Sequence, residues 1–273
     1  MNLFDQMLSR YDIKTESERL NAMHEIMQEI TLAGLYRGGF FEKAAFFGGT
    51  CLRIFHGLSR FSEDMDFTLL NSSGDFIFED YFPDIISEFK STGRTVEIIR
   101  KIKRKKTDIE SAFLNDATEI FNISFRTEKV VKIKLEVELN PPGFTNTEQK
   151  LLLHPFSFFT RCVSLPDMFA GKIHALLFRN WKIRIKGRDW YDFEWYIRNN
   201  VPLNFESFRS RTKQINGIDI DLTGFTSLLF KRLSETEIEK VIRDVMPFIR
   251  NHDELKIWSN EYFTELAKRI IVQ

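Results

Sequence analysis

One segment, residues 130–139, alternates apolar and charged side chains without a break from Val131 onward, and this alternation constrains the fold. One face of the expected strand is apolar, with Val131, Ile133, Leu135, Val137 and Leu139. The other face carries Lys132, Lys134, Glu136 and Glu138. A strand of this kind buries one face against other elements and leaves the second face for polar contacts. Residues 130–139 therefore predict part of a sheet, with residues 121–126 as the hairpin partner.

The order of the other patterns predicts an α+β protein with two domains. Helical spacing extends over residues 15–35 and 76–90, and short strand patterns cover residues 44–47, 64–70 and 95–101. Beyond Pro155 the patterns are helical only, over residues 166–180, 189–198, 205–214, 222–233, 235–249 and 253–271. A mixed half followed by a helical half predicts a mixed-sheet domain over residues 1–160 and a helical bundle domain over residues 161–273.

The stretch between Phe47 and Phe67 carries the most suggestive chemistry. Gly48 and Gly49 end a short strand and lead into a helix, whose first N–H groups and dipole attract phosphate. Asp64 and Asp66 alternate on a strand, so both carboxylates project from one face. Carboxylates suit Mg²⁺, and a pair of such ions can stabilise the attacking and leaving oxygens of phosphoryl transfer. We interpret the stretch as part of a site for a nucleoside triphosphate on divalent metal.

Each part of this pattern also has a structural explanation. A Gly-Gly pair occurs in ordinary tight turns, and alternating acids occur on solvated strand faces. Thr50 is a candidate helix N-cap, and Ser62 either caps locally or contacts a phosphate. Glu136 is the natural third carboxylate, but Glu138 lies on the same face and competes with it for this role.

A second group of candidates lies in the helical half. Lys172 interrupts an apolar stretch where an isolated ammonium is costly to bury, so a charged partner or a phosphate is expected beside it. Asp189 and Asp192, three residues apart, lie on one face of a helix. Asp189 also suits a helix start electrostatically. The residues alone leave both a functional role and a structural ion pair open.

Two basic runs are candidates for nucleic-acid contact. Because the chain has 39 basic and 39 acidic residues, any attraction for a polyanion has to be local. Phosphate contacts would give affinity without reading a base sequence. For residues 100–106 a solvated loop is the favoured interpretation. The second run immediately precedes Asp189 and favours nucleotide or RNA contact; it consists of Lys182, Arg184, Lys186 and Arg188.

Taken in order, these residues resemble the AbiEii-type nucleotidyltransferases. These proteins are toxins of bacterial type IV abortive-infection systems and are related to the MenT tRNA-modifying toxins. The resemblance covers about residues 44–196, and the last third of the chain resembles the family only in being helical. The motifs that carry it are Gly48-Gly49-Thr50-x-Leu52-Arg53, Arg60-x-Ser62-x-Asp64-x-Asp66-Phe67, Lys134-x-Glu136, Lys172 and Arg188-Asp189-x-Tyr191-Asp192.

The resemblance implies a polymerase-β-like nucleotidyltransferase core with an appended helical bundle. The implied reaction is Mg²⁺-dependent transfer of a nucleoside monophosphate from an NTP to an acceptor, expected to be RNA such as tRNA rather than protein. A cognate antitoxin is the other expected partner. The implied metal ligands are Asp64, Asp66 and Glu136, with Glu138 as the alternative to Glu136. The residues expected at the nucleotide are Gly48, Gly49, Thr50, Ser62 and Arg188, with Lys172 on phosphate and Asp189 as a further essential acid.

Two other functions stay open on the residues alone. One is a nucleotide-binding interaction protein that has lost its chemistry, and the other is a metal-dependent nuclease, which has less use for a glycine turn. Cys51 and Cys162 match no metal-binding spacing and indicate free thiols in a reduced compartment. The N-terminus does not resemble a signal peptide, and no apolar run approaches the roughly 20 residues that span a bilayer. A cytoplasmic protein without a membrane partner is therefore expected.

Overall fold

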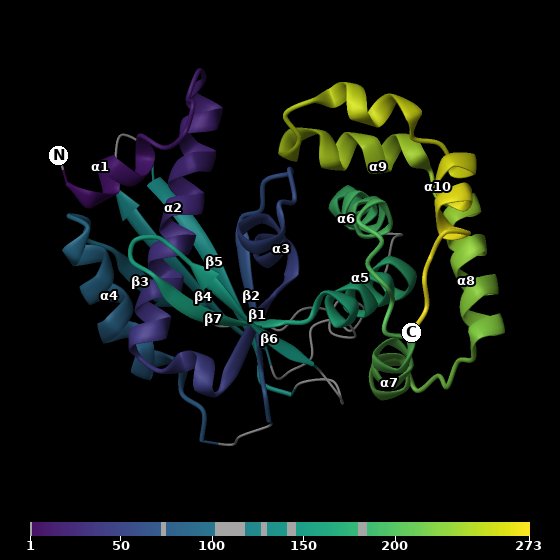
Figure 1. Cartoon of the computed structure of the whole chain (residues 1–273), viewed down its shortest axis with the longest axis horizontal. Coiled ribbons are helices and arrows are strands. Elements are labelled where there is room, and N and C mark those ends of the chain that lie inside the picture. The colour runs from purple at the N-terminus through teal and green to yellow at the C-terminus, as the bar shows by residue number, and fades with distance from the viewer. Residues whose placement is uncertain (1, 72–74, 102–117, 127–129, 141–145, 180–184) are drawn as a thin grey trace. The chain divides into compact units, whose positions relative to one another are not determined.

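The computed structural model describes residues 2–71, 75–101, 118–126, 130–140, 146–179 and 185–273 (Figure 1). The expected α+β class, with a mixed sheet followed by an all-helical region, is confirmed. By its contacts the chain separates into two compact units, and the second unit includes two short segments that precede residue 147. The first unit comprises Met1–Gly57, Ser62–Pro141 and Thr147–Cys162, and the second comprises Leu58–Phe61, Pro142–Asn146 and Val163–Gln273. The division into a domain over residues 1–160 and a domain over residues 161–273 stays a prediction.

A seven-stranded sheet in the order β3-β4-β5-β2-β1-β7-β6 forms the centre of the first unit. The strand β2 pairs with β1 in antiparallel and with β5 in parallel orientation. The predicted hairpin is confirmed as β4 and β5, which pair in antiparallel orientation. The strands are β1 (Ala44–Phe47), β2 (Asp64–Leu69), β3 (Glu97–Arg100), β4 (Thr118–Arg126), β5 (Val130–Glu138), β6 (Thr147–Leu152) and β7 (Phe158–Val163).

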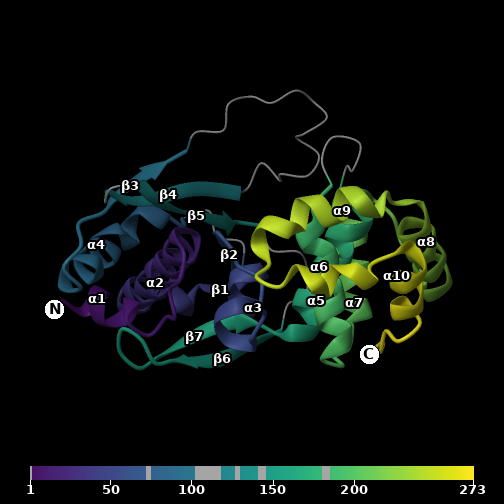
Figure 2. The ribbon, with the colours of Figure 1, turned by 90° about the horizontal axis from the view of Figure 1, so that it is seen from above.

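Helices pack on both sides of this sheet. Figure 2 shows the strands curving around α2, while α3 lies on the other side of β1 and β2. The helix α2 crosses α4 closely at Gly34, where an added Cβ would lie 2.6 Å from the Cα of Ile85. The helices of this unit are α1 (Leu3–Leu8), α2 (Glu16–Arg37), α3 (Gly48–His56) and α4 (Phe82–Ser91).

An aromatic core fixes which face of β2 is buried. The ring of Phe40 lies edge-on to Phe67 and Tyr81, with centroids 5.1 Å apart in both pairs, and to Phe78 at 5.6 Å. Such edge-to-face pairs are favourable beyond the area that they bury. Because Phe67 faces this core, its strand neighbour Asp66 projects from the opposite face.

The second unit is built from helices around α6. The helix α6 packs against α5, α9 and α10, and its Trp190 and Phe193 are fully buried. None of the helices in the described ranges combines the length and apolar character needed to cross a membrane. The helices are α5 (Leu165–Phe178), α6 (Gly187–Arg198), α7 (Phe205–Asn216), α8 (Leu222–Glu235), α9 (Ile238–Val245) and α10 (Asn260–Ala267).

The structure changes several predicted helix boundaries. The helix α3 begins at Gly48 with Phe47 as its N-cap, so the expectation that Thr50 caps it is wrong. The helix predicted over residues 76–90 is a 3₁₀ turn followed by α4, which carries a proline in its first turn. The helix predicted over residues 253–271 is likewise a 3₁₀ turn followed by α10.

Candidate active site

Parallel pairing of β2 with β5 brings the predicted carboxylates together. Asp66 lies directly opposite Glu136, and Asp64 lies opposite Lys134. Directly opposed residues project from the same face of a sheet. Glu138 lies two pairs further along, opposite Thr68. The register therefore favours Glu136 over Glu138 as the third carboxylate.

The first turn of α3 lies against the carboxylate of Asp66. Gly48 has a φ of +80°, and a Cβ at this position would lie 2.3 Å from Oδ2 of Asp66. Only glycine allows both this backbone conformation and this close approach. The first N–H groups of α3, including that of the buried Gly49, thus begin beside the carboxylate pair.

Thr50 and Ser62 hold this arrangement through hydrogen bonds. The hydroxyl of the fully buried Thr50 donates to the backbone carbonyl of Asp64, which joins α3 to β2. The backbone carbonyl of Ser62 accepts a hydrogen bond from Nε2 of Gln28 at 2.9 Å, which joins the start of β2 to α2. Both residues therefore position the strand that carries the aspartates.

Glu136 forms an ion pair with Lys134 on its own strand. Burial alone would lower the pKa of Lys134, but Glu136, Asp64 and Asp66 raise it above its ordinary value. Within the described residues, no three His, Cys, Asp or Glu side chains converge to hold a metal ion. The donor set nonetheless has the right chemistry for Mg²⁺, because the two aspartates offer hard oxygen ligands beside a helix N-terminus.

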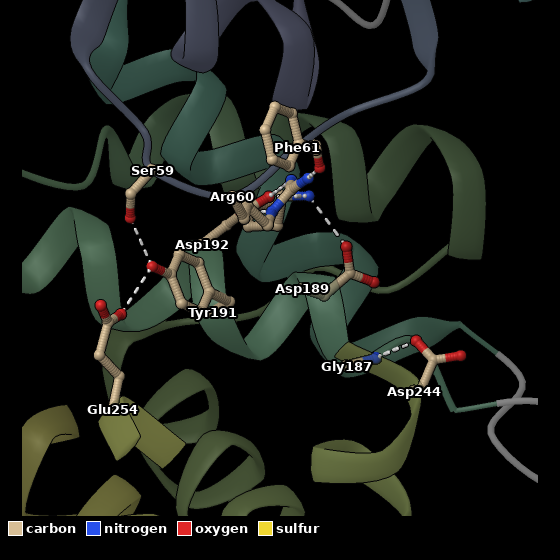
Figure 3. Close-up of polar contacts among 10 residues, drawn as sticks. Ser59, Arg60, Phe61, Gly187, Asp189, Tyr191, Asp192, Asp244 and Glu254 are labelled. Atoms are coloured by element: carbon tan, nitrogen blue, oxygen red, sulfur yellow. Dashed lines mark hydrogen bonds and ion pairs between the residues drawn. The ribbon is translucent and has the colours of Figure 1, made fainter. Parts of the chain in front are cut away.

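In the second unit, Arg60 and Lys172 share the carboxylate of Asp192. Nε and Nη2 of Arg60 donate to the two oxygens of Asp192 at 2.6 and 2.7 Å (Figure 3). The ammonium of Lys172 lies 2.8 Å from Asp192 and 2.9 Å from Asp189, which also pairs with Arg179. Three cations thus surround two carboxylates, and both carboxylates are almost completely buried.

This network shifts the proton equilibria of its members. Burial alone would raise the pKa of Asp189, but Lys172 and Arg179 hold it well below its ordinary value. Burial would also raise the pKa of Asp192, but the charges of Arg60 and Lys172 outweigh burial and lower this pKa. Both carboxylates are therefore ionised, and the partner that was expected beside Lys172 is an aspartate pair.

We expect the second unit to lose stability as the pH falls below about 4. A carboxyl group whose pKa is lower in the folded protein binds fewer protons there, so its stabilisation is present above the unfolded value of 3.8 and is lost on acidification. All four tryptophans lie between residues 181 and 258, within this unit, so their fluorescence reports its unfolding. The urea midpoint measured this way should fall between pH 5 and pH 3, and should fall less for Asp189→Asn. Equal falls would contradict the role of Asp189.

Further contacts position α6, which carries both aspartates. The hydroxyl of Tyr191 donates to Glu254 at 3.0 Å and lies 2.6 Å from the hydroxyl of Ser59. The N–H of Gly187 donates to Asp244 at 2.7 Å (Figure 3). A Cβ at Gly187 would lie 2.1 Å from the carbonyl oxygen of Val241, so glycine is required where α6 meets α9.

The basic runs are only partly described. In the first run, Arg100 pairs with Glu79 and Glu119, and residues 102–106 lie outside the described ranges. In the second run, Lys182 and Arg184 also lie outside them. The guanidinium of Arg188 lies 4.3 Å from the ring centroid of Phe248. The pKa of Lys186 is lowered by burial and by the charge of Arg179.

Arg60 and Lys134 contribute more than the sequence indicated. Both belong to the motifs of the resemblance, but neither was predicted as a site residue. Arg60 is completely buried in the second unit although its sequence neighbours Asp64 and Asp66 belong to the first. The sequence features that could have indicated them are the position of Arg60 four residues before Asp64, where β2 begins, and the position of Lys134 two residues before Glu136 on the same strand face.

A mixed sheet with paired aspartates on its central strand, beside a helix that starts with Gly-Gly, fits the nucleotidyltransferase class. The sequence pattern of the family described as "Nucleotidyl transferase AbiEii toxin, Type IV TA system" matches residues 30–268. The chain therefore belongs to the AbiEii nucleotidyl transferase toxin family of type IV toxin–antitoxin systems. No curated protein matches the chain.

Solved structures show the same fold at low sequence identity. One is JHP933 from Helicobacter pylori, with a TM-score of 0.54, 15% identity, and coverage of 91% of this chain and 90% of that chain. Another is a candidate nucleotidyltransferase from H. pylori, with a TM-score of 0.50, 17% identity, and coverage of 90% and 92% respectively.

Proposed function

We propose that this protein transfers a nucleoside monophosphate from an NTP to an acceptor hydroxyl and releases pyrophosphate. The observation that carries the proposal is the meeting of β2, β5 and α3. Asp66 lies opposite Glu136 on one side and against the backbone of Gly48 on the other. A triphosphate at the start of α3 would therefore lie beside the carboxylates that hold its metal ions.

The chain's own residues bind and orient the reactants. Asp64, Asp66 and Glu136 would hold two Mg²⁺ ions, which when bound activate the acceptor oxygen and offset charge on the leaving pyrophosphate. The N–H groups at Gly48 and Gly49 would fix the direction of the triphosphate. Catalysis of this kind is mostly positioning and electrostatic stabilisation.

We assign Lys172, Arg188 and Asp189 to the same reaction because of the resemblance of the sequence to the family. The surplus of cations over carboxylates around Lys172 supports contact with an anionic group, since among the described residues three cations pair with two carboxylates, those of Asp189 and Asp192. Asp189 would then orient Lys172.

The proposed acceptor is RNA such as tRNA. Lys186 and Arg188, directly before Asp189 in the sequence, would contact the RNA backbone by charge and confer no base specificity. Membership of a type IV toxin–antitoxin family supports an antitoxin as the regulatory partner.

The decisive experiment measures transfer of label to RNA. The protein is incubated with Mg²⁺, total RNA and each α-³²P-labelled NTP in turn, and the RNA is separated on a gel. We expect label on one size class of RNA with the wild-type protein and none with Asp66→Asn. Glu138→Gln is the matched control, because Glu138 lies on the same strand face but opposite Thr68.

Other outcomes would reject the proposal. Full transfer by Asp66→Asn would contradict the metal site. RNA cleavage without NTP would indicate a nuclease. No label on RNA, together with no thermal shift on adding Mg²⁺ and any NTP, would indicate an interaction protein without this chemistry, since a bound ligand raises the apparent stability.

A further inference from the structure

Lys134 lies among the proposed metal ligands of the first unit. It lies on β5 directly opposite Asp64 and two residues before Glu136. Its ammonium forms an ion pair with Glu136, whose side chain is 23% exposed, while that of Lys134 is 33% exposed. The pair is therefore partly shielded from water, and its attraction is only partly screened.

The position of Lys134 differs from that of Lys132 on the same face of the strand. Lys132 is exposed to solvent and lies opposite Ser124 of β4. Lys134 is half-buried and experiences the charges of Glu136, Asp64 and Asp66 together. The two lysines are two residues apart on one strand but have different surroundings. Of the two, Lys134 is the one that lies beside the carboxylates of Asp64, Asp66 and Glu136.

We propose that Lys134 competes with divalent metal for the carboxylate of Glu136 and so sets the metal affinity of the site. This inference rests on the proposed function, because it takes Asp64, Asp66 and Glu136 as the metal ligands. Mutual repulsion between the three carboxylates is offset by the ammonium until a metal ion replaces it. Metal binding is then an exchange of cations on Glu136, and the lysine acts as a positioning residue.

The chemistry of lysine suits this exchange. Its ammonium is a compact charge on a flexible four-carbon stem, so it can leave Glu136 without movement of the backbone. The ion pair also explains why Glu136 does not converge with the two aspartates on a common point, because its carboxylate is held toward Lys134. Release of Lys134 therefore frees Oε1 of Glu136 to become a ligand.

The test is a direct measurement of metal affinity. The full-length protein is titrated with Mn²⁺, and the free ion is followed by its electron paramagnetic resonance signal. We expect Lys134→Met to bind Mn²⁺ about threefold more tightly than the wild type, because removal of a partly exposed ion pair is worth up to a fewfold in affinity. Lys132→Met removes the same charge from the same face and should change the affinity less than about twofold.

Two further variants define the site and the role of charge. Asp66→Asn should abolish the Mn²⁺ site that responds to Lys134. Lys134→Arg keeps the positive charge and should not tighten binding, and Lys134→Gln is a second neutral variant in case the methionine variant fails to fold.

Unchanged or weaker Mn²⁺ binding in the neutral variants would overturn the proposal. Tighter binding in Lys134→Arg would overturn it as well, and so would a wild-type protein that binds no Mn²⁺. The same measurements separate failure of the proposed transfer reaction from failure of the proposed competition. If label transfer is absent but Lys134→Met still tightens the Asp66-dependent Mn²⁺ site, the competition stands and the transfer reaction is wrong.

Discussion

Replacement of Gly48 by alanine is expected to lower the rate of nucleotidyl transfer at least about a hundredfold, the usual scale for loss of a positioning group. The added Cβ would lie 2.3 Å from Oδ2 of Asp66, which is far inside van der Waals contact. Either the carboxylate or the first turn of α3 has to move. Both movements separate the helix N-terminus from the proposed metal ligands, so transfer should fall while the fold is retained.

Gly57→Ala is the matched control for backbone strain. Gly57 ends the same helix with a φ of +76°, close to the +80° of Gly48, but a Cβ there would meet nothing within 4 Å. Both substitutions therefore cost similar backbone strain, and only Gly48→Ala disturbs Asp66. Transfer rates are measured with the labelled NTP that the wild type uses. Equal rates in the two variants would show that the contact between Gly48 and Asp66 is not needed.

Replacement of Arg60 by methionine is expected to destabilise the second unit by about 3–5 kcal/mol, as loss of one partner of a buried ion pair usually does. The guanidinium of Arg60 is completely buried and makes both of its hydrogen bonds to Asp192 within 2.7 Å. Without it, Lys172 is the cation left beside Asp192 in the described part of the chain, and Lys172 is shared with Asp189. The uncompensated charge is what lowers the free energy of unfolding.

Urea unfolding followed by tryptophan fluorescence measures this loss, because all four tryptophans lie in the second unit. Arg198→Met is the control, since Arg198 is exposed and lies 3.7 Å from Glu194. A surface pair of this kind contributes about 1 kcal/mol or less. A similar small loss for Arg60→Met would mean that the buried pair adds no stability. The double variant Arg60→Met/Asp192→Leu should recover part of the loss, because it leaves no unpaired carboxylate at this position.

Local patterns predicted the strands that carry the site. The alternation from Val131 to Leu139 predicted β5, and the alternation that begins at Asp64 predicted β2. In both cases a solvated or polar face opposes an apolar one, and the period of two identifies the strand without knowledge of its neighbours. The glycine turn that leads into a helix was also predicted from local sequence, by the Gly48-Gly49 pair. The helix α3 nevertheless begins at Gly48 and not after Thr50.

Non-local contacts could not be predicted from these patterns. The pairing of Asp66 with Glu136 depends on β2 and β5 becoming neighbours in the sheet. The partners Arg60 and Asp192 are 132 residues apart in the sequence. The strands β6 and β7 were missed because their side chains do not divide cleanly into an apolar and a polar face, as the exposed Leu151 and Phe159 show.

The short segment Leu58–Phe61 gives the helical region an unusual dependence on the rest of the chain. It lies between α3 and β2 in the sequence, yet it belongs to the second unit and supplies Arg60 to the interior of that unit. The helical region is thus not a self-contained module. Recombination between relatives that exchanges only the sequence after residue 162 preserves the stability of this unit only if Arg60 and Asp192 remain matched. The two residues therefore have to be exchanged together, although they are 132 positions apart in the sequence.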